Sequence, residues 1–255
     1  MADSDRGNGA CDRIGRVRRR FFVPEFRAGR AVICGEAAHH LSHVLRAEQG
    51  ELYELSDGEH VWLARIEKAG REAVEFALVE EVPVQAPSLV LTLLLAVVKF
   101  DRFEWALEKA TELGVSVIVP LAAARSETRL VKAAPKRAAR WEKVLIEAAQ
   151  QSRRVRAPVI EPMTRPESAF AGRREALRLL LSERPTAAPM RTALEGSESR
   201  GAVFAVGPEG GWTEDEFALA QRSGFQEVSL GKLILRTETA VAAGIAALNY
   251  ALGEG

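Results

Sequence analysis

Two segments near the end of this 255-residue chain carry the residue types best suited to hold a small ligand. The first is Gly207-Pro208-Glu209-Gly210-Gly211, which follows an apolar run at 202–206. The second is Leu230-Gly231-Lys232-Leu233-Ile234-Leu235, the end of an apolar run over 228–235. Proteins built from alternating strands and helices bind ligands at the ends of such buried runs. We therefore expect a ligand site near the ends of these runs.

The charges around the first segment indicate the kind of ligand. Glycine allows positive φ and close backbone approach, which we expect at Gly207, Gly210 and Gly211. A glycine loop before a helix often holds phosphate, but four acidic residues would repel one here: Glu209, Glu214, Asp215 and Glu216. The loop matches neither the P-loop nor the dinucleotide-binding pattern. A cationic ligand such as S-adenosylmethionine fits better, and the alternative is a tight turn beside an acidic helix cap.

The surrounding elements alternate between strands and helices. Thr213 and Glu216 have capping-box spacing, which predicts a helix over 213–223. Two further helices are predicted at 102–113, with Phe103, Leu107 and Ala110 inward, and at 135–153, with Trp141, Val144, Leu145 and Ala148 inward. The predicted strands are 89–98, 115–121, 159–160, 177–181, 203–206 and 228–235. This alternation is typical of a parallel sheet covered on both faces.

The N-terminal third has a different pattern. Residues 36–46 predict a helix with Ala37, Leu41, Val44 and Leu45 on its apolar face. Alternating residues predict strands at 52–55, 61–66 and 73–79, the first two joined by a turn at Asp57-Gly58. These elements predict a small β-barrel. The predicted organisation is a disordered tail at 1–15, a barrel domain at 16–82, a proline-containing linker at 83–88 and an α/β domain at 89–255.

Charge is distributed unevenly although the formal net charge is zero. Residues 13–30 hold seven arginines and one acidic residue, and residues 125–156 hold ten basic residues and three acidic ones. Local basic clusters are compatible with RNA binding, and a solvated helix surface is the alternative for the second cluster. The longest apolar run is too short to span a bilayer, so no membrane association is expected. Two cysteines without metal-ligand spacing predict a reducing, cytoplasmic location.

His39 and His43 are four residues apart and could share a metal ion. The segment has no glutamate of the H-E-x-x-H pattern and no third ligand nearby. We expect no metal.

The two C-terminal segments together resemble a known family. Gly-Pro-Glu-Gly-Gly followed by Leu-Gly-x-x-Ile-Leu-Arg-Thr-Glu-Thr-Ala is similar to the ribosomal RNA small-subunit methyltransferase E family of SPOUT enzymes, which methylates N3 of a uridine in 16S rRNA. Five further segments resemble family motifs: Arg18 to Pro24, His40 to Arg46, Lys99 to Trp105, Glu112 to Val115, and Gln150 to Arg154. The chain has Phe100 and Arg153 where the family usually has glycine.

The resemblance implies a fold, a cofactor and partners. It implies an α/β SPOUT domain with a trefoil knot, preceded by a PUA-like RNA-binding barrel, and a homodimer formed through the C-terminal domain. S-adenosylmethionine would be held by Gly207, Pro208, Glu209, Gly210, Gly211, Leu230, Gly231, Leu233, Ile234 and Leu235. The 16S rRNA would be contacted by Arg18, Arg20, His40, Arg46, Lys99, Arg102, Arg125, Gln151 and Arg154.

Methylation at N3 of uracil constrains the catalytic residues. This nitrogen is a weak acid whose lone pair is exposed on deprotonation, so catalysis needs a stabilising cation or a base. Arg236 is the predicted cation, and Glu238 could position it or help move the proton. Alternatively, the two residues merely pair at a helix start. Two other functions stay open: a SPOUT enzyme acting on another RNA or a ribose 2′-OH, and a PUA-like RNA-binding protein with a silent pocket.

Overall fold

The computed structural model describes residues 19–253, so the tail predicted at 1–15 and the predicted RNA contact Arg18 lie outside the described residues. The chain divides into two compact units. The first comprises the chain up to Gln85 together with Arg153–Arg156, and the second comprises Ala86–Ser152 and Ala157 onward.

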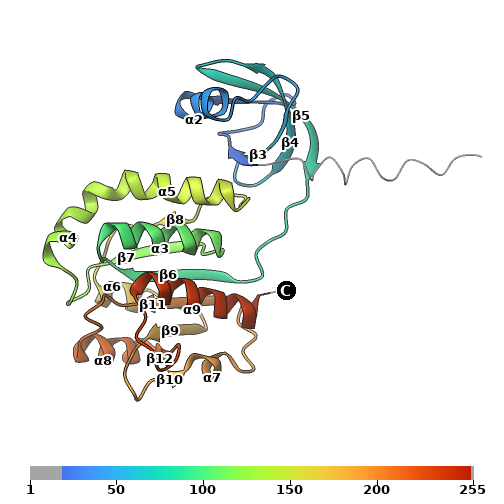
Figure 1. The fold of residues 1–255 in the computed structure, drawn as a ribbon. Helices are drawn as coiled ribbons and strands as arrows, with labels where there is room; N and C mark the ends of the chain where they lie inside the picture. The colour runs from blue at the N-terminus through green and yellow to red at the C-terminus, as the bar shows by residue number, and fades with distance from the viewer. Residues whose placement is uncertain (1–18, 254–255) are drawn as a thin grey trace, which may run out of the picture. The chain divides into compact units, whose positions relative to one another are not determined.

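The first unit is built on a curled five-stranded sheet (Figure 1). Its strands, in the order β1-β3-β4-β5-β2, are β1 (Arg20–Phe22), β3 (Leu52–Ser56), β4 (Val61–Ala69), β5 (Ala73–Val82) and β2 (Arg30–Cys34). The predicted hairpin is confirmed, because β3 and β4 pair antiparallel around Asp57-Gly58. Asp57 Oδ1 accepts hydrogen bonds from the amides of Glu59 and His60, and Gly58 has φ 96°. Strand β2 was not predicted.

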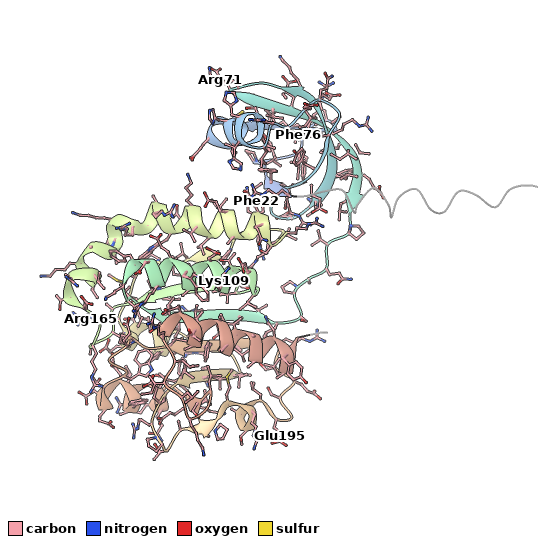
Figure 2. The ribbon with its side chains drawn as sticks, in the orientation of Figure 1. Phe22, Arg71, Phe76, Lys109, Arg165 and Glu195 are labelled. Carbon is pink, nitrogen blue, oxygen red and sulfur yellow. The ribbon has the colours of Figure 1, made fainter. Side chains whose placement is uncertain are left out.

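The helix predicted at 36–46 is two short pieces, α2 (Gly35–His39) and the π-helical turn η1 (His40–Val44). Leu41 is buried as predicted, but Val44 is 62% exposed and Leu45 is also exposed. The prediction for these two residues is wrong because the Leu45 amide donates to the His40 carbonyl, five residues back. A π turn changes the angular spacing on which the α-helical apolar face depends. The unit's core instead includes Phe76, which is fully buried (Figure 2).

The second unit contains the predicted parallel sheet. Its seven strands pair in parallel in the order β10-β12-β9-β11-β6-β7-β8. Their bounds are β6 (Val90–Ala96), β7 (Val117–Leu121), β8 (Val159–Ile160), β9 (Leu177–Leu181), β10 (Ala188–Pro189), β11 (Gly201–Val206) and β12 (Gln226–Ser229).

Helices cover both faces of this sheet (Figure 1). One face packs against α3 (Phe100–Glu112), α5 (Ala138–Gln151), α7 (Met190–Leu194) and α9 (Thr237–Leu252). The other packs against α6 (Pro166–Ala171) and α8 (Glu214–Arg222). The inward residues predicted on α3 and α5 are buried. The helix predicted at 135–153 begins later, because α4 (Thr128–Ala133) and the 3-10 turn η2 (Ala134–Arg137) precede α5.

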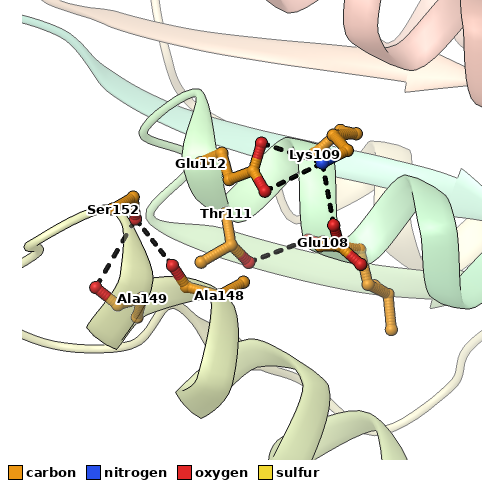
Figure 3. Close-up of polar contacts among 8 residues, drawn as sticks. Glu108, Lys109, Thr111, Glu112, Ala148, Ala149 and Ser152 are labelled. Atoms are coloured by element: carbon orange, nitrogen blue, oxygen red, sulfur yellow. Dashed lines mark hydrogen bonds and ion pairs between the residues drawn. The ribbon is translucent and has the colours of Figure 1, made fainter. Parts of the chain in front are cut away.

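Three acidic side chains on α3, those of Glu104, Glu108 and Glu112, form ion pairs. Lys109 Nζ lies 2.8 Å from an oxygen of both Glu108 and Glu112 (Figure 3), and these hydrogen bonds raise the pKa of Lys109. Glu104 accepts a hydrogen bond of 3.2 Å from Arg140. Glu104, Glu108 and Glu112 therefore form an ion-paired helix surface.

Candidate active site

The carboxyl ends of the central strands bring the chemically interesting segments to one edge of the sheet. Strand β11 lies between β9 and β6, and β6 is followed by β7. Segments 182–185, 207–211, 97–102 and 122–126 follow these four strands directly. Parallel pairing therefore places them side by side, as expected for a ligand site in an open α/β sheet.

The glycines of segment 207–211 serve packing more than backbone conformation. Within this loop, positive φ occurs only at Gly211, at 68°, so Gly207 and Gly210 do not use the positive φ that glycine allows. A Cβ on Gly207 would lie 3.0 Å from the Trp212 ring, and one on Gly210 would lie 3.2 Å from Cβ of Arg125. A side chain at either position would therefore press on a neighbouring side chain.

The capping box that begins α8 is present. Thr213 accepts from the Glu216 amide, and the Glu216 carboxylate accepts from the Thr213 amide. Glu216 is buried, and its other oxygen accepts from the Ala124 amide at 2.9 Å. Glu216 is thus a structural carboxylate, and of the other three acidic residues Glu209 pairs with Arg102 and Glu214 with Arg184.

The second predicted segment is a loop, which corrects the strand predicted over 228–235. Strand β12 ends at Ser229, and Gly231 has φ 136°. This conformation is rare for residues with a side chain and turns the backbone out of the sheet. Leu233 and Ile234 consequently extend into solvent, 82% and 80% exposed. These two apolar side chains therefore lie outside the core of the sheet.

A cavity of about 1220 Å³ lies beside this loop. It is lined by Leu230-Gly231-Lys232, by Glu183-Arg184-Pro185 after β9, and by α7 and the end of α9. No motif in the sequence points to 183–185. The available signal was their position directly after a predicted buried strand.

Four side chains join the glycine loop to the start of α9. Thr237 Oγ1 donates to the Gly207 carbonyl at 3.3 Å. Arg102, at the start of α3, donates from Nη1 to Glu209 at 2.8 Å, and its Nε lies 3.9 Å from Glu238. The two motif segments therefore meet in space. Arg102 was predicted to contact RNA, and here its guanidinium pairs with two carboxylates while its side chain stays 26% exposed.

Arg236, the predicted catalytic cation, occupies the N-cap position of α9. Its side chain is exposed. The geometry leaves its guanidinium accessible to a bound substrate.

Arg20, another predicted RNA contact, is bonded inside the first unit. It is 7% exposed, and its Nε donates to Glu54 at 3.0 Å. Its Nη1 donates to the Arg153 carbonyl at 2.6 Å within the first unit. Because the guanidinium is buried and bonded internally, it cannot contact a phosphate in this conformation.

The remaining predicted RNA contacts are accessible to different degrees. Arg46, Lys99, Arg125 and Gln151 are exposed, while His40 and Arg154 are half-buried. Arg125 donates to the Gly210 carbonyl at 2.8 Å, so it also supports the glycine loop. Burial lowers the pKa of Arg154, and the neighbouring charge of Arg156 lowers it further.

The two departures from the family pattern have distinct environments. Arg153 has φ 55°, a left-handed conformation that glycine adopts at little cost. The conformation is thus present although the residue differs. Phe100 packs edge-on against Trp141, with the Arg137 guanidinium 4.8 Å from its ring centre.

The described residues contain no group of three or more His, Cys, Asp or Glu side chains that could hold a metal ion. The rings of His39 and His43 lie 4.5 Å apart without a third such partner among these residues. Within residues 19–253, no helix is both long and apolar enough to cross a membrane.

Comparisons with known proteins cover both units. A family model described as an RNA methyltransferase domain matches residues 85–249, and one described as an RNA methyltransferase PUA domain matches residues 33–79. The chain is 36% identical over 220 residues to ribosomal RNA small subunit methyltransferase E of Synechocystis, covering 84% of this chain and 71% of the relative. It is 33% identical over 227 residues to the protein of that name from Mycobacterium bovis, covering 86% of each.

Solved structures are similar along nearly the whole chain. One is a ribosomal RNA small subunit methyltransferase E from Neisseria gonorrhoeae bound to S-adenosyl methionine, with 34% identity, a TM-score of 0.82, and coverage of 92% of this chain and 98% of that one. Another is a Legionella pneumophila methyltransferase in complex with its cofactor SAM, with 29% identity, a TM-score of 0.84, and coverage of 94% and 100%. With its PUA-like curled sheet and parallel-sheet SPOUT domain, the chain belongs to the ribosomal RNA small subunit methyltransferase E family.

Proposed function

We propose that this protein transfers a methyl group from S-adenosylmethionine to N3 of a uridine in 16S rRNA. The observation that carries the proposal is the meeting of the glycine loop with the start of α9 at the carboxyl edge of the sheet. Relatives of the same family are named for methylation of small-subunit rRNA, and two similar solved structures hold the cofactor.

The residues present suit a cationic, partly apolar cofactor. Gly207 and Gly210 keep space that a side chain would fill. Leu233 and Ile234 offer exposed apolar surface, and Glu209 offers negative charge. We assign cofactor binding to these residues together with Pro208, Gly211, Leu230, Gly231 and Leu235. When bound, S-adenosylmethionine supplies a methyl group on a sulfonium sulfur.

Arg236 would stabilise the uracil anion that forms when N3 loses its proton. A guanidinium fixed beside a developing negative charge lowers the barrier because little reorganisation is needed during the reaction. Its exposure at the N-cap of α9 leaves it within reach of an RNA base. Glu238, two residues later, is the second proposed catalytic residue.

The first unit would bind the rRNA. Its proposed RNA contacts are Arg18, His40, Arg46 and Arg154, and the second unit would add Lys99, Arg125 and Gln151. The proposed organisation is an RNA-binding domain at 16–82, a linker at 83–88 and a knotted methyltransferase domain at 89–255. An rRNA substrate places the protein in the cytoplasm.

We further propose a homodimer formed through the methyltransferase domain. Trp105 on α3 and Tyr250 on α9 are exposed, the latter by 94%. Exposed apolar side chains of this size are common where a second protein surface packs. Sedimentation analysis tests this directly, and a Tyr250→Glu variant should shift the protein toward monomer.

Nucleoside mass spectrometry of 16S rRNA from a deletion strain tests the reaction. Loss of 3-methyluridine, restored by the wild-type gene but not by an Arg236→Ala variant, would support the proposal. Loss of a 2′-O-methylated nucleoside instead would favour the ribose reaction. Unchanged nucleosides, with RNA binding retained in vitro, would favour a binding protein.

A further inference from the structure

A small cluster of charges links the glycine loop, α3 and α9. The Arg102 guanidinium lies 2.8 Å from Glu209 Oε1 and 3.9 Å from Glu238 Oε1. Residues 102 and 209 are 107 positions apart in the chain, so this contact depends on the assembled sheet edge. One positive charge lies beside two negative ones, so the cluster of Arg102, Glu209 and Glu238 carries a net negative charge.

Glu238 has an unused oxygen in this cluster. Its side chain is 14% exposed, and its Oε2 is buried without a hydrogen-bond partner among the described residues. A buried carboxylate oxygen normally has a donor, because leaving it unpaired costs free energy. The missing partner is therefore a hydrogen-bond donor.

We propose that Glu238 Oε2 accepts the N3 proton of the target uracil and that Arg102 is the positioning residue that holds this carboxylate. The inference rests on the proposed function. The proton on N3 passes to Oε2, and the N3 electron pair forms the bond to the methyl carbon. The carbon–sulfur bond breaks with its electron pair remaining on sulfur, which becomes neutral. The protonated carboxyl later releases its proton to water.

Arg102 acts through charge as well as through one hydrogen bond. Its short contact is with Glu209, whereas its 3.9 Å separation from Glu238 is an ion pair rather than a hydrogen bond. Without the guanidinium, two carboxylates on neighbouring segments would repel each other. We expect the carboxylate of Glu238 then to turn away from the base while the glycine loop keeps its packing against Trp212.

Four variants test this: Glu238→Gln, Arg102→Ala, Arg102→Lys and the double variant Arg102→Ala/Glu238→Gln. The measurements are the single-turnover methylation rate on 16S rRNA and the Kd of S-adenosylmethionine by calorimetry. Glu238→Gln should lower the rate by about 100-fold or more, the usual scale of acid–base catalysis. Arg102→Ala should approach the same loss, and Arg102→Lys should recover part of it. The double variant should be no slower than Glu238→Gln, because residues that act as one unit are not additive.

Arg173→Ala is the matched control. Arg173 pairs with Glu161 at 2.9 Å, and its side chain is 16% exposed, comparable to 26% for Arg102. It should lose stability but keep the wild-type rate. Three results would overturn the inference: additive losses in the double variant, equal rate losses in Arg173→Ala and Arg102→Ala, or a weakened cofactor Kd in Glu238→Gln. Wild-type protein that forms no 3-methyluridine would instead sink the proposed function itself.

Discussion

Arg236, the predicted catalytic cation, lies exposed at the start of α9. It precedes the first helical residue of α9, with its side chain exposed, while the neighbouring Thr237 is buried and bonded to Gly207. The start of the helix is thus fixed by Thr237 and not by the side chain of Arg236, which makes no capping hydrogen bond. Substitution at Arg236 should change chemistry and leave stability nearly unaltered.

We expect Arg236→Ala to reduce kcat by about 100- to 1000-fold, the usual cost of removing one preorganised charge-stabilising donor. Arg236→Lys should recover only part, since an ammonium lacks the planar fork of donors. Raising the pH should partly rescue Arg236→Ala, because hydroxide then supplies the uracil anion. Single-turnover kinetics and cofactor calorimetry check this. A rate within a few-fold of wild type would make the residue structural.

Arg20, unlike Arg236, is buried and has a structural role. Removing it would leave Glu54, 3% exposed, as a buried carboxylate without its cation. Breaking such a pair from one side typically costs about 3–5 kcal/mol. Arg20→Ala should therefore destabilise the first unit, measured by hydrogen exchange of the β3 amides. Arg27→Ala is the control, because its ion pair with Glu25 is exposed and should contribute about 0–1 kcal/mol.

At the scale of elements, α9 lies against β11 through a glycine. An added Cβ on Gly244 would overlap the ring of Phe204, which is fully buried. Gly244→Ala should force the helix away from the strand and cost about 1–3 kcal/mol, the usual range for overpacking. Chemical denaturation measures the loss. Ala246→Ser, on the exposed side of the same helix, should stay within about 0.5 kcal/mol of wild type.

The glycine loop provides a second prediction for an element. Gly210 has no positive φ, so the backbone tolerates a side chain there, but the Cβ would press on Arg125. Gly210→Asp should abolish S-adenosylmethionine binding while the protein stays folded. Calorimetry and circular dichroism test the two halves of this statement. Gly172→Asp, at the end of α6, should bind the cofactor normally, and so would Gly210→Asp if the loop were not part of the pocket.

At the scale of the whole molecule, affinity for rRNA should fall steeply with salt, because basic side chains release counterions from phosphate. Replacing Arg18, Arg19 and Arg46 by alanine should flatten the slope of log K against log salt by about 0.7–0.9 for each phosphate that is no longer neutralised. Arg20 is left in place, since its replacement would disturb the fold. A Lys68→Ala variant, which removes an exposed lysine, is the control. An unchanged slope in the triple variant would place the RNA-binding surface elsewhere.

The sequence by itself determined the features that depend on neighbouring residues. The alternation of apolar runs and amphipathic helices predicted the parallel sheet, because each strand and helix face must be buried locally. The capping box at Thr213 and Glu216 and the Asp57-Gly58 turn were predicted for the same reason: each depends on residues within four positions. The two C-terminal motifs were sufficient to indicate the family.

The tertiary structure decided which charges pair and where apolar residues are left exposed. Arg20 and Arg102 were predicted to contact RNA because the neighbouring sequence does not show which carboxylate each arginine pairs with. The partner of Arg20 is Glu54, 34 positions away, and the partner of Arg102 is Glu209, 107 positions away. Leu233 and Ile234 were predicted to lie in a strand because they continue an apolar run. The backbone leaves the sheet at Gly231, where φ is 136°, and the apolar run does not indicate this point. Both kinds of information arise only when residues distant in the chain come together and the backbone takes its final path.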